Sequence, residues 1–285
     1  MNAVWMLLAG LSFSITGVLV KYGSGQFTSA ELVFHRCFWS LVFLFIIMKL
    51  RRQKVGRTNL RRHFARSLAG FASMILFFHA MTVLPLATAT TLSYTSPLFL
   101  VVLSIFWLKE KAHPLQILTI CMGFAGVLIL LGPSFNHGQL PDALSGLAAG
   151  LLAGVAYMNV RSMGREGEPV WNTVFYFSLI STILSAIWAV FHTMHPLTWG
   201  NLWIVTGIGF SATLGQLFLT KAYQSGQTVV TGAFNYSTII FASLFGVVLW
   251  GETLSPMAWA GMAILIGSGI VMVMLSSSRP PKAEV

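Results

Sequence analysis

Three ionisable residues stand at the start of the apolar stretch 30–49: Glu31, His35 and Arg36. Charged groups in such surroundings are costly and are therefore candidates for binding or proton transfer. The planar guanidinium of Arg36 is suited to holding a carboxylate or phosphate through two hydrogen bonds. Alternatively, Arg36 pairs with Glu31 or extends its charge to the edge of the stretch. Glu31 and His35 are four residues apart, so they form either a proton relay or a simple hydrogen-bonded pair.

A proline well inside an apolar stretch marks a second group of candidates. Pro97 leaves the carbonyl of Ser93 without its helical hydrogen bond and predicts a kink there. Because a free carbonyl in apolar surroundings needs a partner or a water-lined cavity, we expect Ser93 and the adjacent Tyr94 to contact a substrate. The alternative is a purely structural kink, resolved by Ser or Thr side chains. His79, near the end of the preceding apolar stretch, either bonds a substrate or makes a capping contact.

Polar residues also recur along the apolar stretch 228–250, at Thr228, Thr231, Asn235 and Thr238. Spacings of three and four residues place these side chains on one helix face. Such a face is costly against apolar surroundings, so it is expected to point toward the protein interior. Asn235 and its neighbour Tyr236 are the predicted substrate contacts of the second half of the chain.

The sequence lacks the motifs that metal, nucleotide and hydrolytic chemistry require. It contains no HExxH, GxSxG or CxxC, no P-loop, and no GxGxxG after a strand pattern. Cys37 and Cys121 fall in apolar stretches and are interpreted as small buried hydrophobic residues. We therefore expect no enzyme activity, no metal, no cofactor and no direct use of ATP.

The composition is that of a membrane protein. Of the 285 residues, 56% are hydrophobic and only 8% are charged, whereas a soluble chain carries roughly 25% charged residues. The mean hydropathy is +0.78. In a soluble protein the net charge of +10 would suggest nucleic-acid binding, but here much of it lies in one segment between two apolar stretches. We therefore expect a lipid bilayer, and no nucleic acid, as a partner.

Ten stretches are long and apolar enough to be transmembrane helices, which need ~20 mostly apolar residues. They lie at about 2–20, 30–49, 66–83, 88–108, 114–131, 143–160, 170–191, 201–220, 228–250 and 256–275. Pro114 and Pro256 open two of them, at first-turn positions where the missing N–H costs nothing. The sequence therefore predicts an all-α membrane protein with ten transmembrane helices.

Basic residues gather in every second segment between these spans. With the N-terminus in the cytoplasm, all but two of the 17 lysines and arginines follow the second, fourth, sixth, eighth or tenth span. The largest group runs from Lys49 to Arg66, and Arg66 is counted in this loop. The exceptions are Lys21, on the outside, and Arg36, within a span. Because cytoplasmic loops are rich in Lys and Arg, the pattern predicts a multi-pass protein of the cytoplasmic membrane with both termini cytoplasmic.

The two halves of the chain resemble each other. A shift of 142 residues lays Tyr94 on Tyr236, Glu110 on Glu252 and Pro114 on Pro256, and a shift of 140 lays Lys21 on Arg161. Each half then holds five helices, and because five is odd the second half must enter the membrane upside down. We expect two inverted five-helix repeats, residues 1–137 and 138–285. Inverted repeats favour alternating access to a midplane site, although duplication can also simply build a stable bundle.

Two stretches carry a resemblance to a known family. The first runs from Ala80 to Ala89 and on through Ser96-Pro97-Leu98-Phe99 to Trp107-Leu108-Lys109-Glu110; the second runs from Lys221-Ala222-Tyr223-Gln224 to Leu249-Trp250-Gly251-Glu252. Together with Arg36 early in the second helix, they resemble the drug/metabolite transporter superfamily, in particular the EamA-type transporters with ten helices in two repeats. The resemblance implies this fold and transport in general, and no particular substrate. Lys109-Glu110 departs from the commoner Gly-Glu of the family.

The expected function is that of a secondary transporter. It would move a small metabolite, such as an amino acid or related organic anion, by alternating access, with protons or a counter-substrate as further partners. Arg36 would hold the anionic group of this substrate. The protein would be a monomer or a homodimer. The alternatives are a membrane-embedded enzyme, which would need a catalytic constellation, and a structural membrane subunit, whose functional residues would lie in loops.

Overall fold

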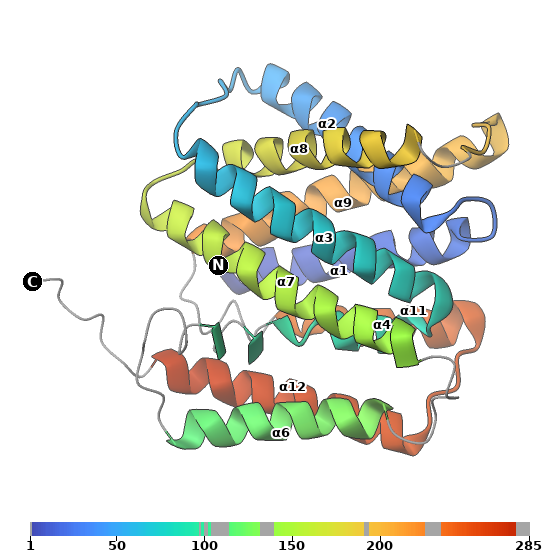
Figure 1. The fold of residues 1–285 in the computed structure, drawn as a ribbon, viewed down its shortest axis with the longest axis vertical. Helices are drawn as coiled ribbons and strands as arrows, with labels where there is room; N and C mark the ends of the chain where they lie inside the picture. The colour runs from blue at the N-terminus through green and yellow to red at the C-terminus, as the bar shows by residue number, and fades with distance from the viewer. Residues whose placement is uncertain are drawn as a thin grey trace, which may run out of the picture.

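The computed structural model describes residues 2–96, 98–99, 102–103, 114–131, 140–190, 194–225 and 235–277, and it is helical within them (Figure 1). The helices are α1 (Asn2–Gly23), α2 (Ser29–Leu50), α3 (Leu60–Val83), α4 (Leu86–Ser93), α6 (Pro114–Leu131), α7 (Leu140–Arg165), α8 (Val170–Val190), α9 (Trp199–Ser225), α11 (Ser237–Trp250) and α12 (Pro256–Ser277). Each of these ten helices overlaps one of the ten predicted stretches. Six of them, α1, α2, α3, α7, α8 and α9, are long and apolar enough to cross a membrane, while α6, α11 and α12 contain shorter apolar segments.

Local sequence signals explain several helix ends. At the start of α2, the Thr28 side chain accepts from the N–H of Glu31 and the Glu31 carboxylate accepts from the N–H of Thr28, which is a capping box. Gly251 ends α11 with a φ of 60°, a left-handed conformation that suits glycine. The helix α3 begins at Leu60, six residues before the predicted stretch. The prediction missed these residues because the first turns of α3 are polar and the local hydropathy is low there.

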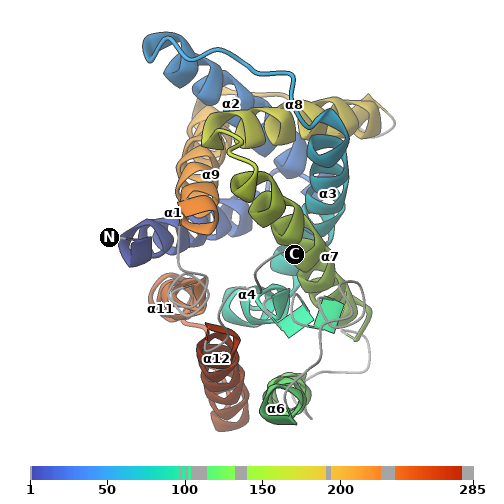
Figure 2. The ribbon, with the colours of Figure 1, turned by 90° about the vertical axis from the view of Figure 1, so that its left-hand side faces the viewer.

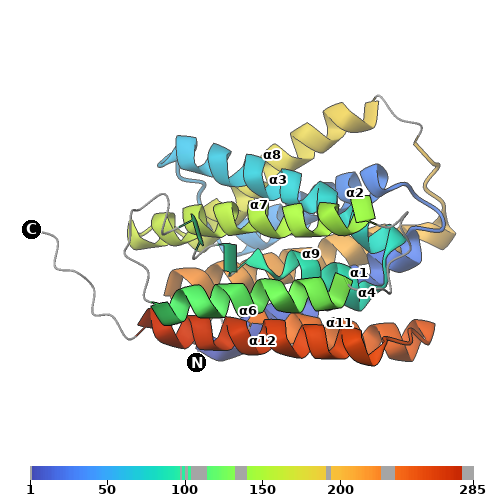
Figure 3. The same cartoon turned by 60° about the horizontal axis from the view of Figure 1, so that its bottom comes forward.

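The helices that surround the centre of the molecule come from both halves of the chain. α1 packs on α9 and α11, α3 packs on α7, and α2 packs on α8 and α9. Figure 2, which looks along the helices, shows these elements and α4 arranged around a common centre. α6 and α12 lie together outside this group and run side by side (Figure 3). The predicted inversion of the two repeats is a separate matter and stays a prediction.

The bundle has two ends, at which the helices begin and finish. The end where α1 finishes and α2 begins is called the Lys21 end. The end where α2 finishes and α8 begins is called the Glu168 end. Because α2 has 22 residues, the two ends are separated by about 33 Å of helix.

Glycines let α7 approach the break at the end of α4. A Cβ atom added at Gly150 would lie 2.9 Å from the carbonyl oxygen of Ser93 and 3.0 Å from that of Leu92. One turn earlier, a Cβ at Gly146 would lie 3.1 Å from Cβ of Leu92. Small residues at this spacing allow two helix backbones to come close, which holds the end of α4 against α7.

Gly150→Ala is expected to destabilise the protein by about 1–3 kcal/mol, because its methyl group would meet fixed backbone carbonyls. Thermal unfolding of the purified protein in detergent measures the effect. Gly267→Ala is the matched control, since Gly267 lies in a helix and a Cβ there meets nothing within 4 Å. An equal unfolding temperature for the two variants would contradict the close contact between α7 and α4.

Candidate substrate-binding cavity

A cavity lies between the helices at the centre of the bundle. Its lining comes from α1, α2, α3, α4, α7, α8, α9 and α11, so both halves of the chain contribute. About 100 Å³ of it is open to the centres of water molecules, whereas about 10–15 Å³ suffices for one water. The aromatic part of its lining comprises Phe13, Phe77, Phe78, Tyr94, Tyr157 and Phe177. The site can therefore enclose a small organic molecule.

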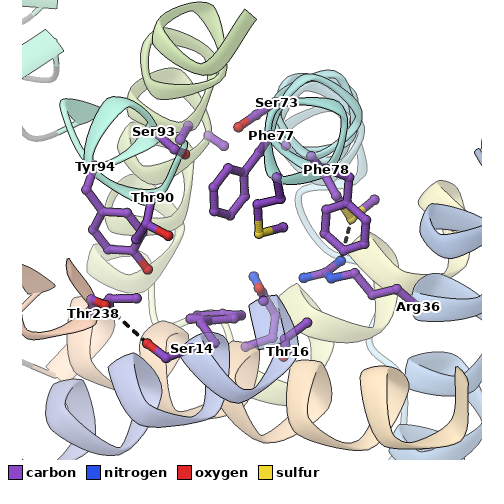
Figure 4. Close-up of a pocket in the computed structure, with 18 of the residues that line it drawn as sticks. Ser14, Thr16, Arg36, Ser73, Phe77, Phe78, Thr90, Ser93, Tyr94 and Thr238 are labelled. Atoms are coloured by element: carbon purple, nitrogen blue, oxygen red, sulfur yellow. Dashed lines mark hydrogen bonds between the residues drawn. The ribbon is translucent and has the colours of Figure 1, made fainter. Parts of the chain in front are cut away.

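Arg36 projects from α2 into this cavity (Figure 4). Its side chain is buried, and its Nη1 donates a hydrogen bond of 2.6 Å to the sulfur of Met74, which is a weak acceptor. Its Cζ atom lies 5.7 Å from the centroid of the Phe177 ring, a cation–π contact. The alternatives of a pair with Glu31 or an extension to the edge of the helix are wrong, because Glu31 bonds His195 and Arg36 points inward.

Arg66 is a second cationic residue of the cavity, and its predicted place in a loop is wrong. It belongs to α3, is 2% exposed and lines the cavity. Its Cζ atom lies 3.7 Å from the Phe177 centroid, and its Nε and Nη1 atoms have no hydrogen-bond partner among the described residues. The sequence did contain a signal, since Arg66 directly adjoins an apolar stretch, one helical turn after Arg62.

Hydroxyl groups line the wall opposite Arg36. Figure 4 shows Thr90 and Tyr94 pointing into the cavity, and Ser93 lies beside them, so the structure brings the candidates Ser93 and Tyr94 together with Arg36. Below them, the Ser14 hydroxyl donates 3.1 Å to the carbonyl oxygen of Thr238. This wall offers donors and acceptors to the uncharged part of a ligand.

The helix carrying Ser93 is interrupted where the sequence predicts a kink. α4 ends at Ser93, and Tyr94 and Thr95 form a turn in which the N–H of Tyr94 donates 2.9 Å to the carbonyl of Thr90. Pro97 itself lies outside the described residues. Together with the close approach of Gly150, this turn places the backbone of Ser93 against α7 and its side chain in the cavity.

Three other predicted contacts lie away from the cavity lining. His79 is largely exposed and its Nε2 lies 2.9 Å from Oδ1 of Asp142, a contact between α3 and α7. Asn235 and Tyr236 are buried, and the Tyr236 ring packs directly over Gly269 of α12. Of the predicted polar stripe, Thr228 and Thr231 lie outside the described residues, whereas Thr238 lines the cavity.

Glu31 and His35 do not bond each other. The Glu31 carboxylate accepts from the Thr28 hydroxyl at 2.8 Å and lies 2.9 Å from Nδ1 of His195. Both ring nitrogens of His35 lack a hydrogen-bond partner among the described residues, and its ring contacts Phe27 and Phe34. The candidate relay therefore has no hydrogen bond between its two members.

An ion pair lies at the Lys21 end of the bundle. Lys21 of α1 pairs with Glu252, which follows α11, and the same Glu252 oxygen accepts 3.1 Å from the N–H of Leu86 at the start of α4. The ammonium of Lys21 also lies 5.2 Å from the Trp250 ring centroid. Three segments distant in sequence are thus joined at one carboxylate, a role that sequence reasoning did not assign to Glu252.

A network around Glu168 joins segments at the opposite end. Its carboxylate accepts from the Thr58 hydroxyl at 2.7 Å and from Asn172 at 2.9 Å, and lies 3.2 Å from Nε2 of His63. Burial alone would raise the pKa of Glu168, but these hydrogen bonds outweigh it and hold the pKa below its ordinary value of 4.5. The network ties the segment after α2 to the start of α8.

Glu168→Gln is expected to destabilise the protein by about 1–3 kcal/mol at pH 7, because charged hydrogen bonds are lost. Since folding lowers the pKa of Glu168, its contribution is present above pH 4.5 and is lost as the pH falls through the folded-state pKa. The difference in unfolding temperature between wild type and variant should therefore shrink below pH 4.5. The control is Glu166→Gln, which removes an exposed pair with Arg62 and should change stability by about 1 kcal/mol or less. A pH-independent difference would contradict a charged Glu168.

Within the described residues, no group of three or more His, Cys, Asp or Glu side chains could hold a metal ion. Among the described residues that line the cavity there is no carboxylate, and the charged ones are Arg36 and Arg66. Chemically, the described lining combines two cationic side chains with aromatic and hydroxyl walls.

The chain is similar to known transporters over nearly its whole length. The sequence profile of the EamA-like transporter family matches residues 1–132 and 141–275. An uncharacterised transporter of Helicobacter pylori is 29% identical, covering 94% of this chain and 93% of the relative. The pseudopaline exporter of Pseudomonas aeruginosa is 25% identical, covering 93% of each chain. A solved crystal structure, 19% identical, covers 97% of this chain and 98% of its own with a TM-score of 0.71, which shows the shared fold.

Proposed function

Since this chain belongs to the EamA-like transporter family, we propose that it is a secondary transporter that carries a small organic anion across the cytoplasmic membrane by alternating access. It is a multi-pass membrane protein with homologues named as transporters. The anionic substrate, the location in the cytoplasmic membrane and alternating access are proposals.

The observation that carries the proposal is the buried guanidinium of Arg36 in a cavity whose described lining holds no carboxylate. A buried charge without a counter-charge is expensive, and a bound anion would compensate it. Ser93, Tyr94 and Thr90 face the same space and would bond the remaining polar groups of the ligand. The pseudopaline exporter and other relatives named as transporters support the transport of a small metabolite.

Alternating access follows from the proposed repeats, residues 1–137 and 138–285. In the topology predicted from the basic residues, the Lys21 end faces outward and the Glu168 end faces the cytoplasm. The Lys21–Glu252 pair would then close the outer entrance. Under the inverted repeat, the sequence counterparts of this pair are Arg161 and Glu110, which would close the inner entrance in the opposite state. Glu110 lies outside the described residues.

Flux into proteoliposomes tests the proposal. Purified full-length protein is reconstituted, and uptake of labelled organic acids is compared with uptake by protein-free liposomes. We expect saturable uptake of at least one acid, which an excess of the same unlabelled acid competes away. If no acid in a broad panel shows saturable uptake in either direction, the proposed function is wrong.

A further inference from the structure

Two buried arginines reach the cavity from opposite ends of the bundle. Arg36 lies about 10 Å along α2 from the Lys21 end, and Arg66 lies about 9 Å along α3 from the Glu168 end. Their guanidinium groups nonetheless approach one ring, since the Cζ atoms lie 5.7 Å and 3.7 Å from the centroid of Phe177. The two Cζ atoms are therefore at most about 9.4 Å apart, the sum of these distances.

The described carboxylates cannot neutralise these two charges, because each is engaged elsewhere. The sequence has seven acidic residues, and two of them, Glu110 and Glu284, lie outside the described residues. The other five are paired as follows: Glu31 with His195, Asp142 with His79, Glu166 with Arg62, Glu168 with His63, and Glu252 with Lys21. Within the described part of the chain, the cavity therefore carries two cations and no compensating anion.

We infer that the cavity binds an organic diacid, with one carboxylate on Arg36 and the other on Arg66, and that Arg66 selects diacids over monoacids. Each guanidinium can hold one carboxylate through two parallel hydrogen bonds. A diacid supplies one negative charge to each guanidinium, whereas a monoacid compensates only one of the two buried cations. This inference rests on the proposed function and names the substrate class of the same site.

The dimensions favour a short chain. The cavity has about 100 Å³ open to water centres, and the two Cζ atoms are at most about 9.4 Å apart. Dicarboxylates of four to six carbons place their carboxylates within such a span. The Phe177 ring lies beside both cations and would contact the methylene groups between the two carboxylates.

Binding of matched acids to the full-length protein in detergent tests the inference. The probes are succinate, glutarate and adipate, each compared with the monocarboxylate of the same chain length. The wild type should bind at least one diacid about tenfold or more tighter than its monoacid. Arg66→Gln should lower that diacid affinity about tenfold or more while leaving the monoacid affinity within about twofold. Arg57→Gln, a change at an exposed arginine, should leave both affinities unchanged.

Several results would overturn the inference. These are equal affinities of the wild type for diacids and monoacids, no saturable binding of any of the three diacids, or an unchanged diacid affinity in Arg66→Gln. The comparison of acids on the wild type stands even if the variant does not fold. Saturable transport of monoacids without a preference for diacids would refute this inference and leave the proposed function intact, whereas no transport of either kind would refute the proposed function.

Discussion

Arg36→Met should abolish flux of the anionic substrate without reducing the stability of the empty protein. Loss of one partner of a buried, charged hydrogen bond to a ligand costs about 2–5 kcal/mol, so the ratio of maximal flux to KM should fall at least about thirtyfold. The unliganded fold should be as stable as the wild type or more stable. Methionine fills a similar volume, and it removes a buried charge that no carboxylate among the described residues pairs with.

Flux in proteoliposomes and thermal unfolding of the same purified sample measure the two effects together. Arg57→Met is the matched control, because Arg57 is exposed and outside the cavity lining. Unchanged flux in Arg36→Met would remove Arg36 from the substrate site. Lost flux together with a large drop in unfolding temperature would mean that Arg36 stabilises the fold instead.

Lys21→Gln should weaken the closure of the Lys21 end. The change leaves Glu252 in place, half of a partly buried ion pair whose side chains are 18% and 10% exposed. Loss of one partner from such a pair costs less than the 3–5 kcal/mol of a fully buried one. We expect a cost of about 1.4 kcal/mol or more, equivalent to a tenfold shift in an equilibrium between closed and open states.

The shift can be read from the accessibility of Ser93. In a chain with Cys37 and Cys121 replaced by Ser, a Ser93→Cys variant reports on the cavity when a membrane-impermeant thiol reagent is added outside. Labelling should be about tenfold faster with Lys21→Gln, and Lys21→Arg, which keeps the charge, should label as slowly as Lys21. Equal labelling rates in all three would show that the pair does not control access to the cavity.

The positions of the helices could be predicted from the sequence because each helix is marked by a long apolar run, and prolines mark the starts of α6 and α12. The start of α3 could not, since its first two turns contain Arg61, Arg62 and Arg66 and give no apolar signal. Hydropathy averages over faces of a helix. The averaged hydropathy therefore placed Arg66 in a loop. In the structure Arg66 lies on the inward face of a polar turn of α3 and is buried.

Some of the residues that line the candidate cavity could be predicted from the sequence, and their role in binding stays a prediction. Arg36, Ser93 and Tyr94 line the cavity because a charged or polar group within an apolar helix has few other places to go. Asn235 and Tyr236 are polar groups in an apolar stretch as well, and they are buried. They lie outside the cavity lining, however, and Tyr236 packs against Gly269. The sequence alone does not distinguish a packed interior from a cavity. Glu31 was assigned to His35 on spacing along one helix, whereas its partner His195 is 164 residues away and no local pattern indicates it.

The most direct test of the central claim is the location of a bound anion. A crystal structure of the protein soaked with a bromine-substituted organic diacid would show the ligand by its anomalous signal. We expect this signal in the central cavity, with carboxylate oxygens about 2.7–2.9 Å from the guanidinium nitrogens of Arg36 and Arg66. A saturated crystal with the acid bound elsewhere and the cavity free of it would contradict the claim that these two arginines form an anion site.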